Sequence, residues 1–260
     1  MKTLQEKSVG AAWVRLLQQG DGYVGAVFVD NELESRFDGE DPDAVFAEAV
    51  AAALRTSGAY VGYDGAIQRF LGFFPGGFTD PRYLEQEREY KLAAAARLRD
   101  GAALAACVDA SEPECAAATH VFGTNMLSRF ENARARECLK GPHGQQYLQG
   151  AARFTRGERQ AGLEAMASAL RHYGNASWPL FTFLPYLWAP EEVMFLKPEA
   201  TLAFATSVGD PFPQTYRAGP HMDTWAALEA MTEKTTRELA GLAPRDRIDV
   251  QSFIWVVGNY

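Results

Sequence analysis

The C-terminal segment carries several groups that could do chemistry in close succession, namely Arg245, Asp249, Gln251, Ser252 and Trp255. Carboxylate, amide and hydroxyl groups can hold a ligand or exchange protons with it. The amide and the hydroxyl lie next to the apolar residues 253–255, so they need buried hydrogen-bond partners unless they face a ligand or a partner. The simpler alternative is structural, because Asp246 can cap the first turn of a helix that begins here.

Lys197 is a second candidate, since it stands between Leu196 and Pro198 at the end of an apolar stretch. Its ammonium group either extends out of an apolar wall or is drawn to a buried carboxylate or phosphate. Pro198 suits the first turn of a helix, and a helix N-terminus beside a lysine can bind an anion. Ordinary capping of that helix explains the same residues.

A third group of candidates lies on a helix that we expect to begin at Thr124. Asn125, Glu131 and Arg134 could form a polar pocket on it, although Thr124 is also a good N-cap residue.

The same predicted helix is rich in positive charge: Arg129, Arg134, Arg136 and Lys140 lie on it, and Arg153, Arg156 and Arg159 follow. Glu131 and Glu137 offset only part of the first group. The pattern predicts either a basic face that binds phosphate groups or an ordinary solvated face.

Other chemistries lack their usual sequence patterns. Glu87 and Lys91 are spaced for a salt bridge within one helix rather than for a nuclease metal site. The four histidines and three cysteines do not fall at the spacings of a zinc site. Phosphate-binding, dinucleotide-binding and nucleophile-elbow loops are not found in the sequence either. We therefore expect no metal and no cofactor.

The elements that must position these groups divide the chain into two parts. Strands at 11–17, 23–29 and 33–37, with a tight turn at 19–22 and a helix from Pro42 to about residue 54, predict a small α+β unit over residues 1–60. Residues 61–77 are rich in glycine and aromatic residues and predict a linker with a short helix near 66–71. Residues 78–260 predict a helical domain, with helices at about 82–99, 112–122, 125–139, 145–154, 159–173, 198–208, 224–242 and 246–257. The expected fold class is a mainly α-helical domain preceded by a small α+β unit.

Composition limits the function classes. The 260 residues are 47% hydrophobic and 22% charged, which excludes a disordered or collagen-like chain. A net charge of −8 removes any general attraction to nucleic acid or anionic lipid, so such contacts need a local basic patch. The apolar stretch 178–190 is short and holds three prolines, which favours buried core over a membrane span. With no signal-peptide pattern and an odd number of cysteines, we expect a cytoplasmic protein.

Several motifs resemble a family of uncharacterised bacterial proteins. They are FPGGF with Asp80-Pro81, EREYK at 87–91, TNML at 124–127, FLKP at 195–198 and PRDRIDVQSFIWV at 244–256, which together cover roughly residues 60–260. This resemblance implies no particular reaction. The last motif is also similar to a helical segment that precedes the ATPase of restriction-type nucleases. That similarity implies a recognition module in nucleic-acid defence.

Two function classes follow from these observations. The first is a non-catalytic recognition or interaction module that acts with nucleic acid or with a defence-system partner through the arginine-rich helices and residues 245–255. The second is a hydrolase with a small-molecule pocket around Asp249, Gln251 and Lys197. A pocket that holds Asp249 and Lys197 within mutual reach would favour the hydrolase.

Overall fold

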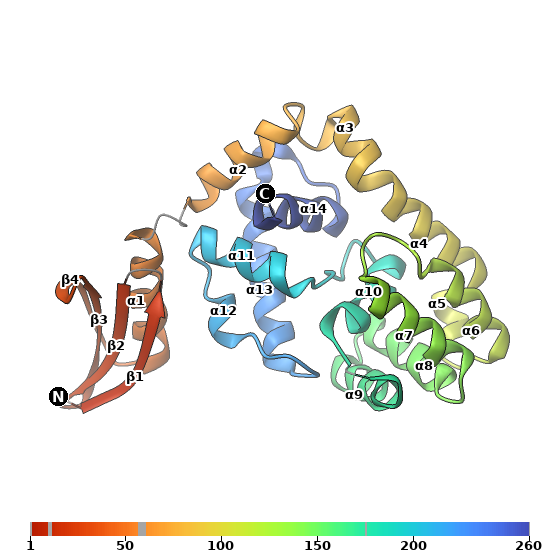
Figure 1. Cartoon of the computed structure of the whole chain (residues 1–260), viewed down its shortest axis with the longest axis horizontal. Coiled ribbons are helices and arrows are strands. Elements are labelled where there is room, and N and C mark those ends of the chain that lie inside the picture. Colours follow the sequence, from red (N-terminus) through yellow and green to blue (C-terminus); the bar gives the residue numbers. More distant parts are fainter. Residues whose placement is uncertain (1, 10–11, 57–60, 175, 260) are drawn as a thin grey trace.

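A computed structural model describes residues 2–9, 12–56, 61–174 and 176–259 and confirms the expected fold class. A small sheet and one helix lie at one end of the molecule, and the remaining chain is helical (Figure 1). Each part has its own hydrophobic core. The expected boundary after residue 60 falls outside the described residues.

The described N-terminal part contains an antiparallel sheet with strand order β1-β2-β3-β4. Its elements are β1 (Lys2–Val9), β2 (Ala12–Gln19), β3 (Gly22–Val29), β4 (Glu32–Gly39) and α1 (Pro42–Thr56). The predicted turn between β2 and β3 is confirmed, and Gly20 there has a φ of 62°, which glycine adopts without strain. Strand β1 was not expected. Its side chains are almost all exposed, so it lacks the alternating apolar pattern that identifies a strand in sequence.

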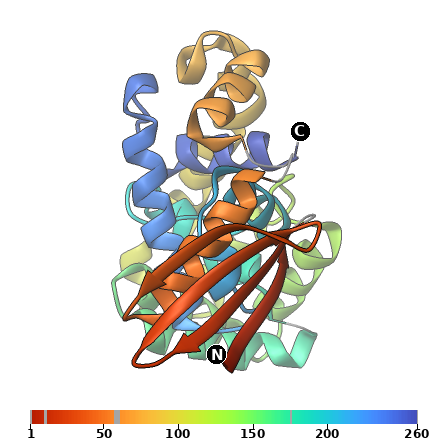
Figure 2. The same ribbon diagram turned by 90° about the vertical axis from the view of Figure 1, so that its left-hand side faces the viewer.

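The two faces of the sheet differ. Helix α1 covers one face, where Val14, Leu16 and Val27 pack against Val45 and Val50. The opposite face carries Trp13 and Leu33, which are 51% and 56% exposed, and points away from the helical part (Figure 2).

The helical part is built from helices that pack around one large core. Its elements are α2 (Gly62–Phe73), η1 (Gly77–Thr79), α3 (Pro81–Tyr83), η2 (Leu84–Arg88), α4 (Glu89–Gly101), α5 (Leu104–Cys107), α6 (Glu112–Ala118), η3 (Thr119–Val121), α7 (Arg129–Lys140), α8 (Gly144–Thr155), α9 (Arg159–Leu170), η4 (Arg171–Tyr173), α10 (Trp178–Trp188), α11 (Pro198–Val208), α12 (Phe212–Thr215), α13 (Met222–Glu238), η5 (Ala240–Leu242) and α14 (Arg247–Asn259).

Helix α10 packs against α4, α7, α8 and α9. Every one of its side chains is buried, which agrees with the expectation that the apolar stretch is core. Among the described residues, no helix combines the length and the apolar character that crossing a membrane requires.

Helix α7 begins later than expected. Ser128, not Thr124, is its N-cap: the Ser128 hydroxyl accepts a hydrogen bond from the Glu131 backbone at 3.2 Å, and the Glu131 carboxylate accepts one from the Ser128 backbone at 2.9 Å. This reciprocal pair is a capping box and needs a Ser-x-x-Glu spacing, which Thr124 lacks. Asn125 consequently lies in a turn before the helix.

The long charged helix expected after Asp80-Pro81 is interrupted by the π-helical turn η2. Such turns insert an extra residue into the helix and shift the direction of the side chains that follow it. Here the turn ends at Arg88 and is followed by Lys91, both of which are buried, and η2 packs against α14. As a result, the side chains of Arg88 and Lys91 contact α14, the C-terminal helix.

Candidate functional site

The polar cluster of α14 is buried, and its centre is the Asp249 carboxylate. Asp249 is fully buried and accepts hydrogen bonds from Tyr83 Oη at 2.6 Å, Arg88 Nη1 at 2.9 Å and Arg245 Nε at 2.8 Å. Arg88 also forms an ion pair with Asp246 at 2.6 Å. Burial alone would raise the pKa of Asp249, but the donors from Arg245, Tyr83 and Arg88 outweigh it and hold the pKa below its usual range.

The expected role of Asp246 as a helix cap is also present. Its carboxylate accepts hydrogen bonds from the backbone of Ile248 at 2.9 Å and of Asp249 at 3.2 Å. The structural interpretation of this segment is therefore confirmed for Asp246, while Asp249 ties α14 to the turn η2.

Lys91 forms the second half of the buried network. Its ammonium group donates to Glu87 Oε2 at 3.1 Å, Gln251 Oε1 at 2.8 Å and Ser252 Oγ at 2.7 Å. The predicted Glu87–Lys91 salt bridge is confirmed. Burial lowers the pKa of Lys91. The three acceptors, however, match the three N–H donors that the lysine has only in its charged form, so these contacts favour the ammonium group.

Lys91 also determines how the Gln251 amide is oriented. A lysine ammonium has donors only, so the amide must turn its oxygen toward Lys91 and its NH₂ group away. That NH₂ group has no hydrogen-bond partner in the described part of the chain. The Ser252 hydroxyl, in contrast, has partners on both sides, because it accepts a hydrogen bond from Lys91 and donates one to Ile248 O at 2.8 Å.

A pocket of about 350 Å³ lies beside this network. It is lined by Glu85, Gln86, Glu87, Tyr90, Lys91, Asn125, Met126, Phe195, Lys197, Gln251 and Trp255. The volume is within the range of small-molecule sites. Aromatic side chains and polar groups both contribute to the wall, and the π-helical turn η2 borders it, as such turns frequently border functional sites.

Lys197 is the prominent charge in this pocket. It is half-buried, its Nζ donates to Met126 O at 3.1 Å, and Nζ lies 4.4 Å from the centroid of the Trp255 ring. Among the described residues no carboxylate lies within 4.0 Å of this ammonium group. Burial lowers the pKa of Lys197, and the negative charges of Glu131 and Glu199 act in the opposite direction.

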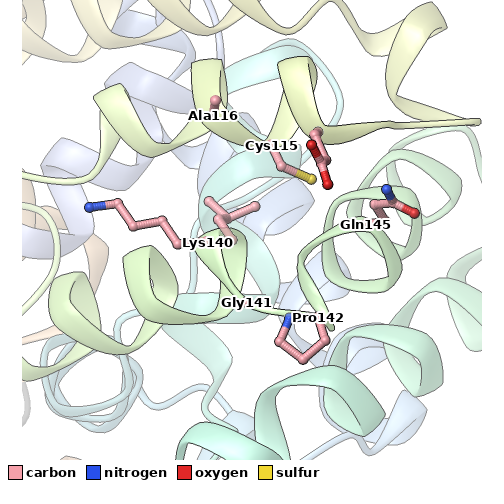
Figure 3. A pocket seen from close by; sticks show the side chains of 8 residues that line it. Cys115, Ala116, Lys140, Gly141, Pro142 and Gln145 are labelled. Atoms are coloured by element: carbon pink, nitrogen blue, oxygen red, sulfur yellow. The ribbon is translucent and has the colours of Figure 1, made fainter.

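A second and larger hollow of about 610 Å³ lies between α6 and the α7–α8 connection. Lys140 and Gln145 stand at opposite sides of it, with the Cys115 thiol between them (Figure 3). Burial raises the pKa of that thiol to about 11, so the thiol stays protonated near neutral pH. Most of the residues that line this hollow are exposed, namely Glu112, Ala116, Lys140, Pro142 and Gln145. We therefore regard the smaller pocket as the better candidate.

The structure brings together some of the candidates chosen from sequence and separates others. Lys197, Gln251, Trp255 and Asn125 all line the pocket, whereas Arg245, Asp249 and Ser252 belong to the network behind it. Glu131 caps α7 and accepts a hydrogen bond from Ser177 at 3.3 Å. Arg134 lies against Gly174, and Arg136 donates to Phe122 O. Asn125, Glu131 and Arg134 were expected to share one pocket. Of the three, only Asn125 lines the pocket described above.

Sequence reasoning missed the partners Tyr83, Arg88 and Lys91 as parts of the site. Their signal was weak, because the interval from Glu87 to Lys91 is typical of an exposed helix. Burial of Arg88 and Lys91 follows from the π-helical turn, which no local pattern predicts. Among the described residues, no group of three or more metal-ligating side chains is arranged to hold a metal ion.

The motifs at 87–91, 124–127, 195–198 and 244–256, far apart in the chain, all reach this region. Comparison with protein-family models, curated proteins and solved structures gives no match to the chain.

Proposed function

We propose that the chain is a recognition protein that binds a small organic anion in the pocket around Lys197. The observation that carries this proposal is the half-buried Lys197 ammonium, which faces a pocket and has no carboxylate partner within 4.0 Å in the described part of the chain. A partly desolvated cation without an anionic partner costs free energy, and an anionic ligand reduces that cost.

Neighbouring groups support an anion at this place. Lys197 precedes helix α11, whose N-terminal N–H groups add partial positive charge. The Gln251 NH₂ group supplies further donors. Trp255, Tyr90 and Phe195 offer apolar surface to the body of a ligand.

The same geometry favours binding over hydrolysis. A hydrolase at this site would need Asp249 as a base near Lys197, but the contacts of Asp249 are with Arg88, Arg245 and Tyr83, and it does not line the pocket. A carboxylate held by two guanidinium groups is a poor proton acceptor. Recognition without chemistry agrees better with these contacts.

Replacing Lys197 with methionine should weaken the binding of benzoate, used as a probe anion, about tenfold or more, because a charge-assisted hydrogen bond is lost. Isothermal titration calorimetry on the wild type and K197M measures the change. The matched control is K140M, which removes the exposed lysine at the rim of the larger hollow. Equal affinity of K197M and the wild type would contradict the proposal.

A second candidate function is binding of nucleic acid, or of a partner in a bacterial cytoplasmic defence system, through α7. The observation that favours it is that Arg129, Arg136 and Lys140 recur at helical spacing and are all exposed. Glu137 lies next to this face and reduces its charge. The face could contact phosphate groups without any pocket.

The double variant R129A/K140A tests this second function better than changes at Arg134 or Arg136, which contact Gly174 and Phe122 O. If α7 binds nucleic acid, we expect weaker binding of a duplex oligonucleotide and a smaller dependence of affinity on salt. The exposed pair substitution R217A/D223A serves as the control. Unchanged affinity at every salt concentration would exclude this face.

A further inference from the structure

We propose that the pocket selects a singly charged carboxylate that carries a flat apolar group, an inference that depends on the proposed function of the same site. Three features lead to this ligand class: the fixed orientation of the Gln251 amide, the balance of charges around the pocket, and its aromatic wall.

The first feature is a pair of fixed donors. Lys91 holds Gln251 Oε1 at 2.8 Å, so the NH₂ group of the same amide is directed away from the network, and Gln251 lines the pocket. Lys197 retains two N–H donors beyond the one that binds Met126 O. A carboxylate has two acceptor oxygens and can accept from both groups at once. In this arrangement Lys91 is a positioning residue, because it acts on the ligand through Gln251.

The second feature is charge. Four charged side chains line the pocket: Glu85, Glu87, Lys91 and Lys197. Glu87 and Lys91 form an ion pair at 3.1 Å and neutralise each other. This leaves two lining charges outside that ion pair, the positive charge of Lys197 and the negative charge of Glu85. Lys197 can be matched by one negative charge on a ligand, while Glu85 repels any further negative charge. A monoanion fits these charges better than a doubly charged phosphate monoester does.

The third feature is the apolar wall. Trp255 lies under the Lys197 ammonium, and Tyr90 and Phe195 complete the aromatic surface. Aromatic side chains bury large apolar area and stack with flat groups at little entropic cost. The ligand body that suits such a wall is an aromatic ring or another planar group.

The experiment is a calorimetric titration of the full chain with four probes of similar shape: benzoate, benzamide, benzamidine and phenyl phosphate. We expect benzoate to bind about tenfold more tightly than neutral benzamide, which lacks the charge. Phenyl phosphate should be weaker than benzoate. If phenyl phosphate is preferred, or if benzamide binds equally well, the ligand class is wrong although the pocket still binds.

Two variants test the mechanism of selection. Q251E keeps an oxygen facing Lys91 but turns a second, negatively charged oxygen toward the pocket. It should lose benzoate affinity about tenfold and gain affinity for the cation benzamidine, whereas general damage to the pocket would weaken both ligands. E85Q changes an exposed residue and should improve phenyl phosphate relative to benzoate severalfold.

The outcomes separate the two proposals. If none of the four probes binds the wild type, the proposed function itself is overturned. If benzoate binds and depends on Lys197, but Q251E retains its preference for benzoate over benzamidine and E85Q leaves the phosphate discrimination unchanged, only the inference about ligand class fails.

Discussion

The variant D249N is expected to lower the free energy of unfolding by about 3–5 kcal/mol, because it removes the buried negative charge that Arg88 and Arg245 share. Arg245 and Arg88 both donate to this carboxylate, and Tyr83 Oη does so at 2.6 Å. The asparagine amide has nearly the same shape, but it carries no charge and turns an NH₂ group toward donors. Chemical denaturation measures the change.

The matched control is D223N. Asp223 also pairs with an arginine, Arg217, at 3.2 Å, but the two side chains are 71% and 60% exposed. Exposed pairs of this kind contribute roughly 0–1 kcal/mol. If D249N and D223N cost the same, the network around Asp249 does not hold α14 in place.

The pH dependence of the same variant gives an independent check. The folded-state pKa of Asp249 is held below the unfolded value, so its contribution is complete above the unfolded pKa of about 4 and is lost as the pH falls through the lower folded-state pKa. The difference in stability between the wild type and D249N should therefore shrink below about pH 4. A difference that stays constant to pH 2 would contradict the role of the charge.

The variant F253A is expected to cost about 3–5 kcal/mol as well, because it removes a fully buried ring from the core. The ring of Phe253 lies 5.3 Å from that of Phe70 in α2 and 5.7 Å from that of Phe204 in α11. It therefore joins three helices that are distant in sequence.

The control for this prediction is F130A, which removes the same side chain from a position that is 61% exposed. We expect it to change the stability by no more than about 0.5 kcal/mol. Thermal and urea unfolding of both variants would test the difference. Similar losses in F253A and F130A would show that the Phe253 ring is not part of the core that fixes α2.

Sequence reasoning predicted those parts of the fold that depend on local patterns. The turn at Gly20 has a local signal in its positive-φ glycine position, and the structure has that turn. The largely apolar stretch 178–190 predicted buried core, which α10 confirms, but a helix over these residues was not among those expected. Strand β1 lacks such a signal because it is an exposed edge strand. The predicted start of α7 was too early because Thr124 and Ser128 are both good N-cap residues. Only Ser128 has a glutamate, Glu131, three residues later to complete a capping box.

The sequence indicated which residues could belong to the candidate site, but not which of them contact one another. Gln251 and Lys197 stood out because polar groups beside apolar runs need partners. Lys197 contacts Met126 O and the Trp255 ring. Gln251 instead finds Lys91, which follows the π-helical turn η2 in the chain. That turn is set by tertiary packing, so sequence patterns at helical spacing predicted an exposed helix face instead.

We propose that Lys197 and Gln251 together hold a carboxylate in the pocket beside α14. The most direct measurement is a crystal structure of the full chain with 4-bromobenzoate, because the anomalous signal of bromine locates the ligand without ambiguity. We predict a bromine peak near Trp255, with the carboxylate within hydrogen-bond distance of Lys197 Nζ and Gln251 Nε2. A ligand bound only at another surface, or a Gln251 amide that turns its oxygen toward the carboxylate, would contradict the account.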